Sequence, residues 1–168
     1  LPSGPAKMDF MTPFRAAAGY SYRPAPGWNI EANVEWLDWD SLNNLALFAP
    51  TVPGGVTAVP FQWDSMFIYE IGASYTTPGG WVFAAGYDYN SNAQPDTFYN
   101  PGVADADRHW LNAGLGQRRE DWEWFLTYQF GYSNRSVTGA IPSAAGQAAN
   151  GKHEARHHAI VFSWQHRF

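Results

Sequence analysis

The stretch WNIEANVEW, from Trp28 to Trp36, alternates between apolar and polar residues without a break. Tryptophan, isoleucine, alanine and valine occupy the even positions, and asparagine and glutamate occupy the odd ones. Successive side chains of a β-strand point to opposite faces of the sheet, so this period of two predicts a strand with one apolar and one polar face.

Six further stretches alternate in the same way, which gives seven predicted antiparallel strands and an all-β fold. The seven cover 14–22, 28–36, 66–75, 81–89, 108–116, 122–132 and 157–168. Their apolar faces hold no Asp, Glu, Lys or Arg, and the strongly polar residues there are His109, His158 and His166. The charged residues of the strands lie on the other face; they are Arg15, Glu31, Glu35, Glu70, Asp88, Arg108, Glu123 and Arg167.

The links between the strands alternate in length. Short turns are expected at 23–27, 76–80 and 117–121, and long loops at 37–62, 91–107 and 134–152. Tryptophan and tyrosine gather near both ends of the strands, whereas small and aliphatic residues occupy the middle. An apolar band between two aromatic belts is typical of a transmembrane up-and-down β-barrel, with short periplasmic turns and long external loops.

Composition excludes several other classes. The 168 residues carry a formal charge of -5, which disfavours a nucleic-acid partner, and they contain no cysteine, which excludes thiolate chemistry. Aromatic residues make up 17% of the chain and charged residues 15%, and the only lysines are Lys7 and Lys152. A soluble β-sandwich also alternates, but it buries its rings and shows charge to water.

No catalytic motif or metal site is predicted. The sequence has no Gly-x-Ser-x-Gly elbow. His153 and His157 share a predicted strand face, but no third ligand accompanies them. We therefore expect no enzyme activity, no metal and no cofactor.

Seven strands is an unusual number, because single-chain bacterial barrels almost always have an even count. A short added strand at Asn43 to Phe48 is one explanation, but it breaks the alternation of short and long links. We therefore expect a single barrel portion over 1–168 that forms the C-terminal part of a larger barrel.

An ordered set of short motifs resembles the C-terminal half of the FadL/TodX family of outer-membrane hydrocarbon transporters. The motifs are DFMTP at 9–13, RPAPGW at 23–28, EANVEWLDW at 31–39, GYDY at 86–89, QPD at 94–96 and DRHW at 107–110, followed by Gly114. The resemblance implies a fourteen-stranded barrel, an N-terminal hatch and transport of long-chain fatty acids or small aromatic hydrocarbons. It also implies an N-terminal barrel half as a partner.

The polar strand faces supply the candidate residues for a ligand path or lumen lining. These are Arg15, Asn29, Glu31, Asn33, Glu35, Met66, Ile68, Glu70, Asp88, Arg108, Trp110, Asn112, Phe125 and Gln129. The charged members either pair across the lumen and brace the barrel or, at Arg15 and Arg108, bind the carboxylate of a ligand.

The long loop that follows Leu37 is apolar for an external segment. It holds Leu42, Leu45, Leu47, Phe48 and Val52 with little charge. Such a loop either offers hydrophobic molecules a landing surface or folds over the barrel rim.

The function expected from sequence is passive transport of hydrophobic molecules across the bacterial outer membrane. The expected partners are the lipid bilayer, lipopolysaccharide and a hydrophobic small molecule. The alternative is a structural or assembly barrel subunit without transport activity, in contact with other envelope proteins.

Overall fold

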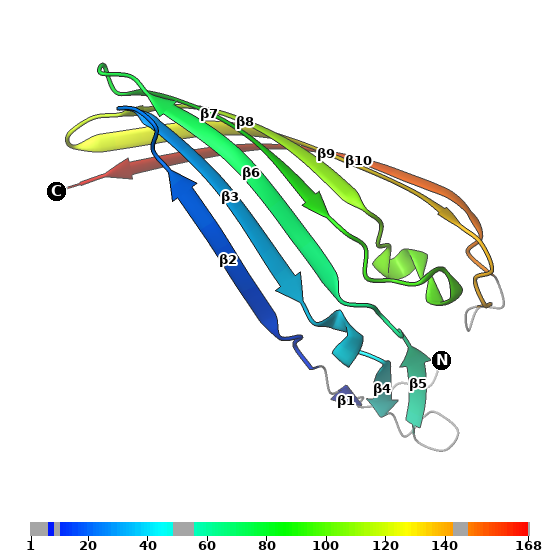
Figure 1. Cartoon of the computed structure of the whole chain (residues 1–168). Helices are drawn as coiled ribbons and strands as arrows, with labels where there is room; N and C mark the ends of the chain where they lie inside the picture. The colour runs from blue at the N-terminus through cyan, green and yellow to red at the C-terminus, as the bar shows by residue number, and fades with distance from the viewer. Residues whose placement is uncertain (1–6, 9–10, 49–55, 143–147, 168) are drawn as a thin grey trace.

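In the computed structural model, which describes residues 7–8, 11–48, 56–142 and 148–167, seven antiparallel strands form one curved sheet (Figure 1). The strands are β2 (Arg15–Tyr22), β3 (Trp28–Leu37), β6 (Met66–Thr76), β7 (Trp81–Asn90), β8 (Arg108–Arg118), β9 (Trp122–Val137) and β10 (Gly151–His166). Their order is β10-β9-β8-β7-β6-β3-β2. The sheet is open, with β2 and β10 at its two edges.

The seven predicted strands and the all-β class are confirmed, although two strands are longer than expected. The sequence predicts a loop over 134–152, but β9 continues to Val137 and β10 begins at Gly151, directly opposite it. The register between the two strands continues unbroken from His166↔Trp122 to this pair. Polar residues occupy both faces of this extension, so the ladder continues where the alternation stops.

A second, small sheet accompanies the loop after β3. It consists of β1 (Lys7–Met8), β4 (Asn44–Phe48) and β5 (Val56–Pro60). The segment considered as an added strand is therefore extended, but it lies outside the seven-stranded sheet. Three 3-10 turns complete the described structure, at η1 (Trp39–Ser41), η2 (Asp96–Phe98) and η3 (Pro101–Val103). None of the described helical turns is long and apolar enough to cross a membrane.

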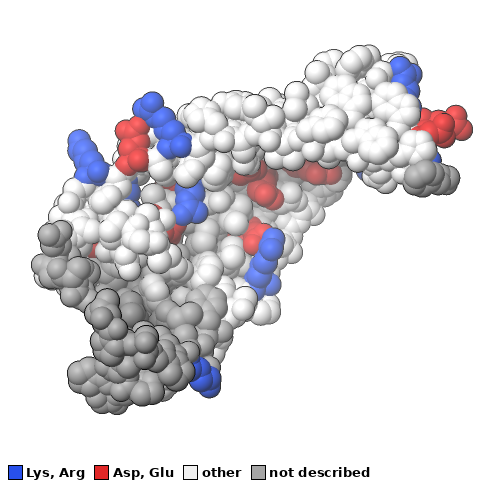
Figure 2. Space-filling model, turned by 180° about the vertical axis from the view of Figure 1, so that it is seen from behind, with Lys and Arg blue, Asp and Glu red and all other residues white. Residues whose placement is uncertain are grey.

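The outer face of the seven-stranded sheet is covered by exposed apolar side chains. The exposed fraction is 71% for Tyr20, 51% for Phe83 and 62% for Trp164. In a space-filling view the middle of this surface shows no charge, charged side chains lie toward its two ends, and acidic groups lie in the hollow below it (Figure 2). In water, a second layer of structure would be needed to bury these rings. No described residues form such a layer over them. The arrangement is that of a wall with lipid on one side.

The buried apolar cluster lies at the loop end of the sheet and not behind its centre. Tyr99, Val137 and Ala140 form it, with Ala149 packed against them. These residues come from segment 91–107, the end of β9 and the link to β10. The loops are therefore packed onto the ends of the strands.

Arg135 of β9 fastens segment 91–107 to the sheet. Its side chain is 10% exposed and lies 2.7 Å from a carboxylate oxygen of Asp96. It donates to the backbone carbonyls of Asp105, at 2.9 Å, and of Gln94. Its guanidinium also lies 5.0 Å from the centre of the Tyr99 ring. One side chain thus connects four residues of the segment.

We predict that Ala85→Arg destabilises the barrel by about 2–4 kcal/mol, because it places a charge on the lipid face at mid-strand. Ala84→Arg costs much less, because Ala84 lies on the same face of β7 as Asp88, toward the hollow. Urea unfolding in lipid vesicles measures both. Equal losses contradict the assignment of the two faces.

We predict that Arg135→Ala loosens segment 91–107 and costs roughly 1.5–3 kcal/mol, since it removes hydrogen bonds made by a charged group. Hydrogen exchange of the segment's backbone amides measures the change. The control is Arg156→Ala, because Arg156 is 66% exposed and pairs with Glu154. Faster exchange in both variants to the same degree contradicts a specific role for Arg135.

Acid releases the same segment. The hydrogen bond from Arg135 lowers the pKa of Asp96 below its ordinary value. The stabilisation is therefore fully present above the ordinary carboxyl pKa of about 3.9 and is lost as pH falls from there through the lower folded value. We expect amide exchange in the segment, corrected for its intrinsic pH dependence, to rise below about pH 4 in the native protein but not in Asp96→Asn. Loss of protection at the same pH in both proteins contradicts this assignment.

Candidate functional site

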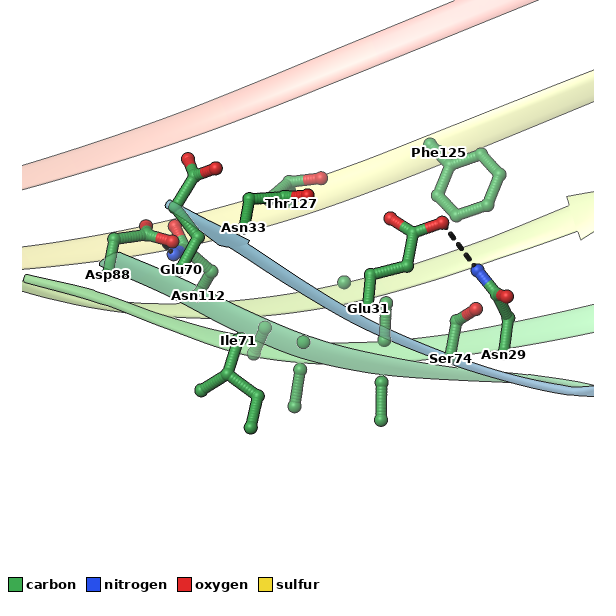
Figure 3. A pocket seen from close by; sticks show the side chains of 17 residues that line it. Asn29, Glu31, Asn33, Glu70, Ile71, Ser74, Asp88, Asn112, Phe125 and Thr127 are labelled. Carbon is green, nitrogen blue, oxygen red and sulfur yellow. Dashed lines mark hydrogen bonds between the residues drawn. The ribbon is translucent and has the colours of Figure 1, made fainter. Parts of the chain in front are cut away.

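The hollow face of the sheet carries the polar half of each alternating strand. In its middle lies a cavity of about 410 Å³, the middle chamber, to which β3, β6, β7, β8 and β9 all contribute. Figure 3 shows Glu31, Glu70 and Asp88 on the hollow side of the ribbon and Ile71 on the opposite side. The period of two read from the sequence is what brings the polar side chains together here.

A chain of hydrogen bonds crosses three strands and ends in this chamber. Gln129 of β9 donates to the amide oxygen of Asn112 on β8 at 2.8 Å. Asn112 in turn donates to the carboxylate of Asp88 on β7 at 2.6 Å. Because Asn112 lies between the other two, each strand is tied to its neighbour by side chains as well as by the backbone ladder.

A second polar group lies toward the β2 edge. Ser21 donates to the Asn29 oxygen at 2.8 Å, and Asn29 donates to Glu31 at 2.8 Å. Arg15 forms an ion pair with Glu35 at 2.5 Å. These contacts join the neighbouring strands β2 and β3 along the hollow face.

The middle chamber is acidic. Glu70 lies directly opposite Asp88 on the next strand, and Asn33 faces Glu70 from the other side. Neither lysine nor arginine occurs among the described residues that line this chamber. The wall therefore presents carboxylates and amides to the hollow, groups that hold water.

A larger cavity, the loop chamber, lies between segment 91–107 and the hollow faces of β8, β9 and β10. Its volume is about 600 Å³. Aromatic side chains line it, among them Tyr99, Trp110, His153 and His157. Arg108 also lines it, but its guanidinium is paired with Asp105 at 3.1 Å. Both arginines considered for a ligand carboxylate thus have acidic partners within the chain.

The structure divides the predicted lining residues among these regions. Asn29, Glu31, Asn33, Glu70, Asp88, Asn112 and Phe125 line the middle chamber, and Arg108 and Trp110 line the loop chamber. The others share the hollow face by register but line neither chamber; they are Arg15, Glu35, Met66, Ile68 and Gln129.

Sequence reasoning did not select most of the loop chamber. Tyr99 lies in a segment without periodicity, and His153 lies in the part of β10 between the predicted loop 134–152 and the predicted strand 157–168. His157 was considered only as a metal ligand. Among the described residues no group of three acidic or histidine side chains is placed to hold a metal ion. The signal available in the sequence was the continued spacing of two from His153 through Ala155 to His157.

The apolar loop after β3 is described in part. Leu42 is 5% exposed and Phe48 is 40% exposed, so one apolar side chain is packed and one is open. Val52 and the side chains of Leu45 and Leu47 lie outside the described residues.

Comparison with solved structures identifies the fold. The crystal structure of a Pseudomonas aeruginosa FadL homologue matches with a TM-score of 0.71 and 17% sequence identity. The match covers 90% of this chain and 33% of that chain, so the chain spans about a third of the length of that structure. The open sheet therefore has the shape of part of a FadL-type barrel.

Comparison of sequences identifies the family. No curated protein gives a significant match. The family model of the outer membrane protein transport proteins (OMPP1/FadL/TodX) matches residues 2–168, nearly the whole chain. The chain therefore belongs to the FadL/TodX family of outer membrane transport proteins, as its motifs indicated.

Proposed function

We propose that this chain forms part of the wall of an outer-membrane barrel through which hydrophobic molecules, long-chain fatty acids or hydrocarbons, cross by passive diffusion. The family assignment carries the proposal. The two chambers on one face of a lipid-exposed wall support it, since they supply a protected route along the strands.

Such a route requires binding but no chemistry. Lipopolysaccharide makes the outer leaflet a poor solvent for apolar molecules, and a water-filled pore excludes them. A barrel wall has its backbone polar groups bonded between strands, so it can shelter a ligand from both. The rings of the loop chamber supply an apolar surface, and the hollow-facing Phe125 supplies one in the middle chamber.

The proposal includes an orientation and a partner. The loop chamber lies on the external side and the short turns lie on the periplasmic side, as in other outer-membrane barrels. Lipid provides no hydrogen bonds for the open edges of β2 and β10. We propose that the strands of an N-terminal barrel half pair with both edges.

The test is uptake of labelled oleate and labelled toluene by cells that lack their own transporter and produce the whole natural protein. We expect faster uptake of at least one compound than in cells with an empty vector. Unchanged uptake of both, with the protein present in the outer membrane, contradicts transport and favours the structural alternative.

A matched pair of variants tests whether the hollow is the route. Ala84→Trp fills the middle chamber and is expected to lower uptake about tenfold, because a bulky ring obstructs the path. Ala85→Trp places the same ring on the lipid face, where aromatic residues are tolerated, and uptake is expected to stay within about twofold. Equal uptake by the two variants, at equal amounts in the membrane, contradicts a route through the hollow.

A further inference from the structure

The floor of the loop chamber is built around a ring that lies flat on the wall. Trp110 of β8 lies opposite Gly131 of β9, which in turn lies opposite His157 of β10. A Cβ atom added to Gly131 would meet three atoms of the Trp110 ring at 2.3, 2.5 and 2.8 Å. The ring therefore occupies the space that any other residue at this position would fill.

His157 continues this floor. Its ring centre lies 5.6 Å from that of Trp110, with 34° between the two planes. Ser133 and Ala155, one step nearer the loops, are small and leave the space above the floor open. The result is a ring surface beneath an open space.

The roof of the chamber is held in place before any ligand arrives. Tyr99 is 6% exposed and packs against the His153 ring at 4.6 Å between centres. The guanidinium of Arg135 also lies over the Tyr99 ring, 5.0 Å from its centre. A cavity that is already formed binds with less loss of conformational entropy.

His157 differs from His153 and His158, which lie on the same strand, β10. His153 contacts the backbone carbonyl of Ala149 at 3.1 Å. His158, on the outer face, contacts the Tyr128 hydroxyl at 2.7 Å. His157 makes no hydrogen bond to any residue that the structure describes, so its ring nitrogens remain available to the chamber.

The molecule itself shows what such an imidazole pairs with. Two phenol hydroxyls, those of Tyr87 and Tyr128, lie 2.7 Å from the Nδ1 atoms of His109 and His158. In the second of these pairs the ring centres are 6.1 Å apart. A phenol placed in the loop chamber can make the same hydrogen bond to His157 while its ring rests on Trp110.

We propose that the loop chamber binds phenolic compounds, with the aromatic ring against Trp110 and the hydroxyl on the imidazole of His157. The inference rests on the proposed function and names a ligand class for it. Stacking between aromatic rings adds to the binding free energy gained from burying apolar area, and an alkyl chain cannot stack in this way. The volume of about 600 Å³ lies within the range of small-molecule sites and admits a two-ring compound.

The experiment measures binding of three probes to the whole natural protein in detergent by equilibrium dialysis against protein-free micelles. 2-Naphthol carries the ring and the hydroxyl, naphthalene carries the ring alone, and 1-decanol carries a hydroxyl on an alkyl chain. We expect 2-naphthol to bind about threefold to tenfold more tightly than naphthalene, the effect of one hydrogen bond.

Two variants separate the two contacts. His157→Phe keeps a ring and removes the hydrogen bond, so the affinity for 2-naphthol falls about threefold to tenfold and that for naphthalene is unchanged. Trp110→Leu lowers the affinity for both aromatic probes at least fivefold and leaves that for 1-decanol unchanged. Gly131→Ala displaces the Trp110 ring and tests the same floor independently.

His158→Phe is the matched control, because it makes the same change one residue away on the opposite face. Its affinities are expected to equal those of the native protein. The proposal is overturned if 2-naphthol binds equally to the native protein and to His157→Phe, or if the control loses as much affinity. If oleate or toluene is taken up but these variants do not change 2-naphthol binding, transport stands and the phenol site is contradicted. If 2-naphthol binds as expected but neither oleate nor toluene is taken up, the phenol site stands and transport is contradicted.

Discussion

The hydrogen-bond requirement of a backbone in hydrocarbon governs this structure. Lipid supplies no partners for N–H and C=O groups, so the strands must bond to one another along their whole membrane length. Each strand then has one face toward lipid and one toward the hollow. This explains why Glu31 and Ile30 are neighbours in sequence but meet different environments. It also explains why the fold needs no buried centre behind the sheet.

The loop end obeys a different rule because it lies in water. There the chain builds a compact cluster around Tyr99 and Val137 and fastens it with the nearly buried Arg135. A guanidinium that donates to a carboxylate and to two backbone carbonyls fixes the path of segment 91–107 where secondary structure does not. The wall is thus stabilised by ladders and the rim by side-chain packing. The loop chamber lies where the two kinds of structure meet.

This difference decides what could be predicted from the sequence. The seven strands were predictable because lipid and lumen impose opposite chemistry on alternate residues, as in Trp28 to Trp36. The ends of β9 and β10 were not, because exposed Asn134 and Arg135, which binds polar groups of segment 91–107, are both polar although they lie on opposite faces. A short strand at Asn43 to Phe48 was considered from the sequence, but its place in a separate small sheet was not predicted. The polar side of the lumen was predicted, but Tyr99 and His153 depend on tertiary packing that no local pattern encodes.

On the proposed transport route, the two chambers would have different roles. At the middle chamber Asn112 and Asp88 hydrogen-bond to each other, and Gln129 beside the chamber donates to Asn112, so these polar groups brace the wall. An apolar molecule would gain little free energy from contact with such a polar surface. In the loop chamber the rings are exposed to the cavity and the arginine is neutralised by Asp105. If the proposed route is correct, ligands are distinguished at the rim, where rings line the cavity, and released in the middle, where the lining is polar.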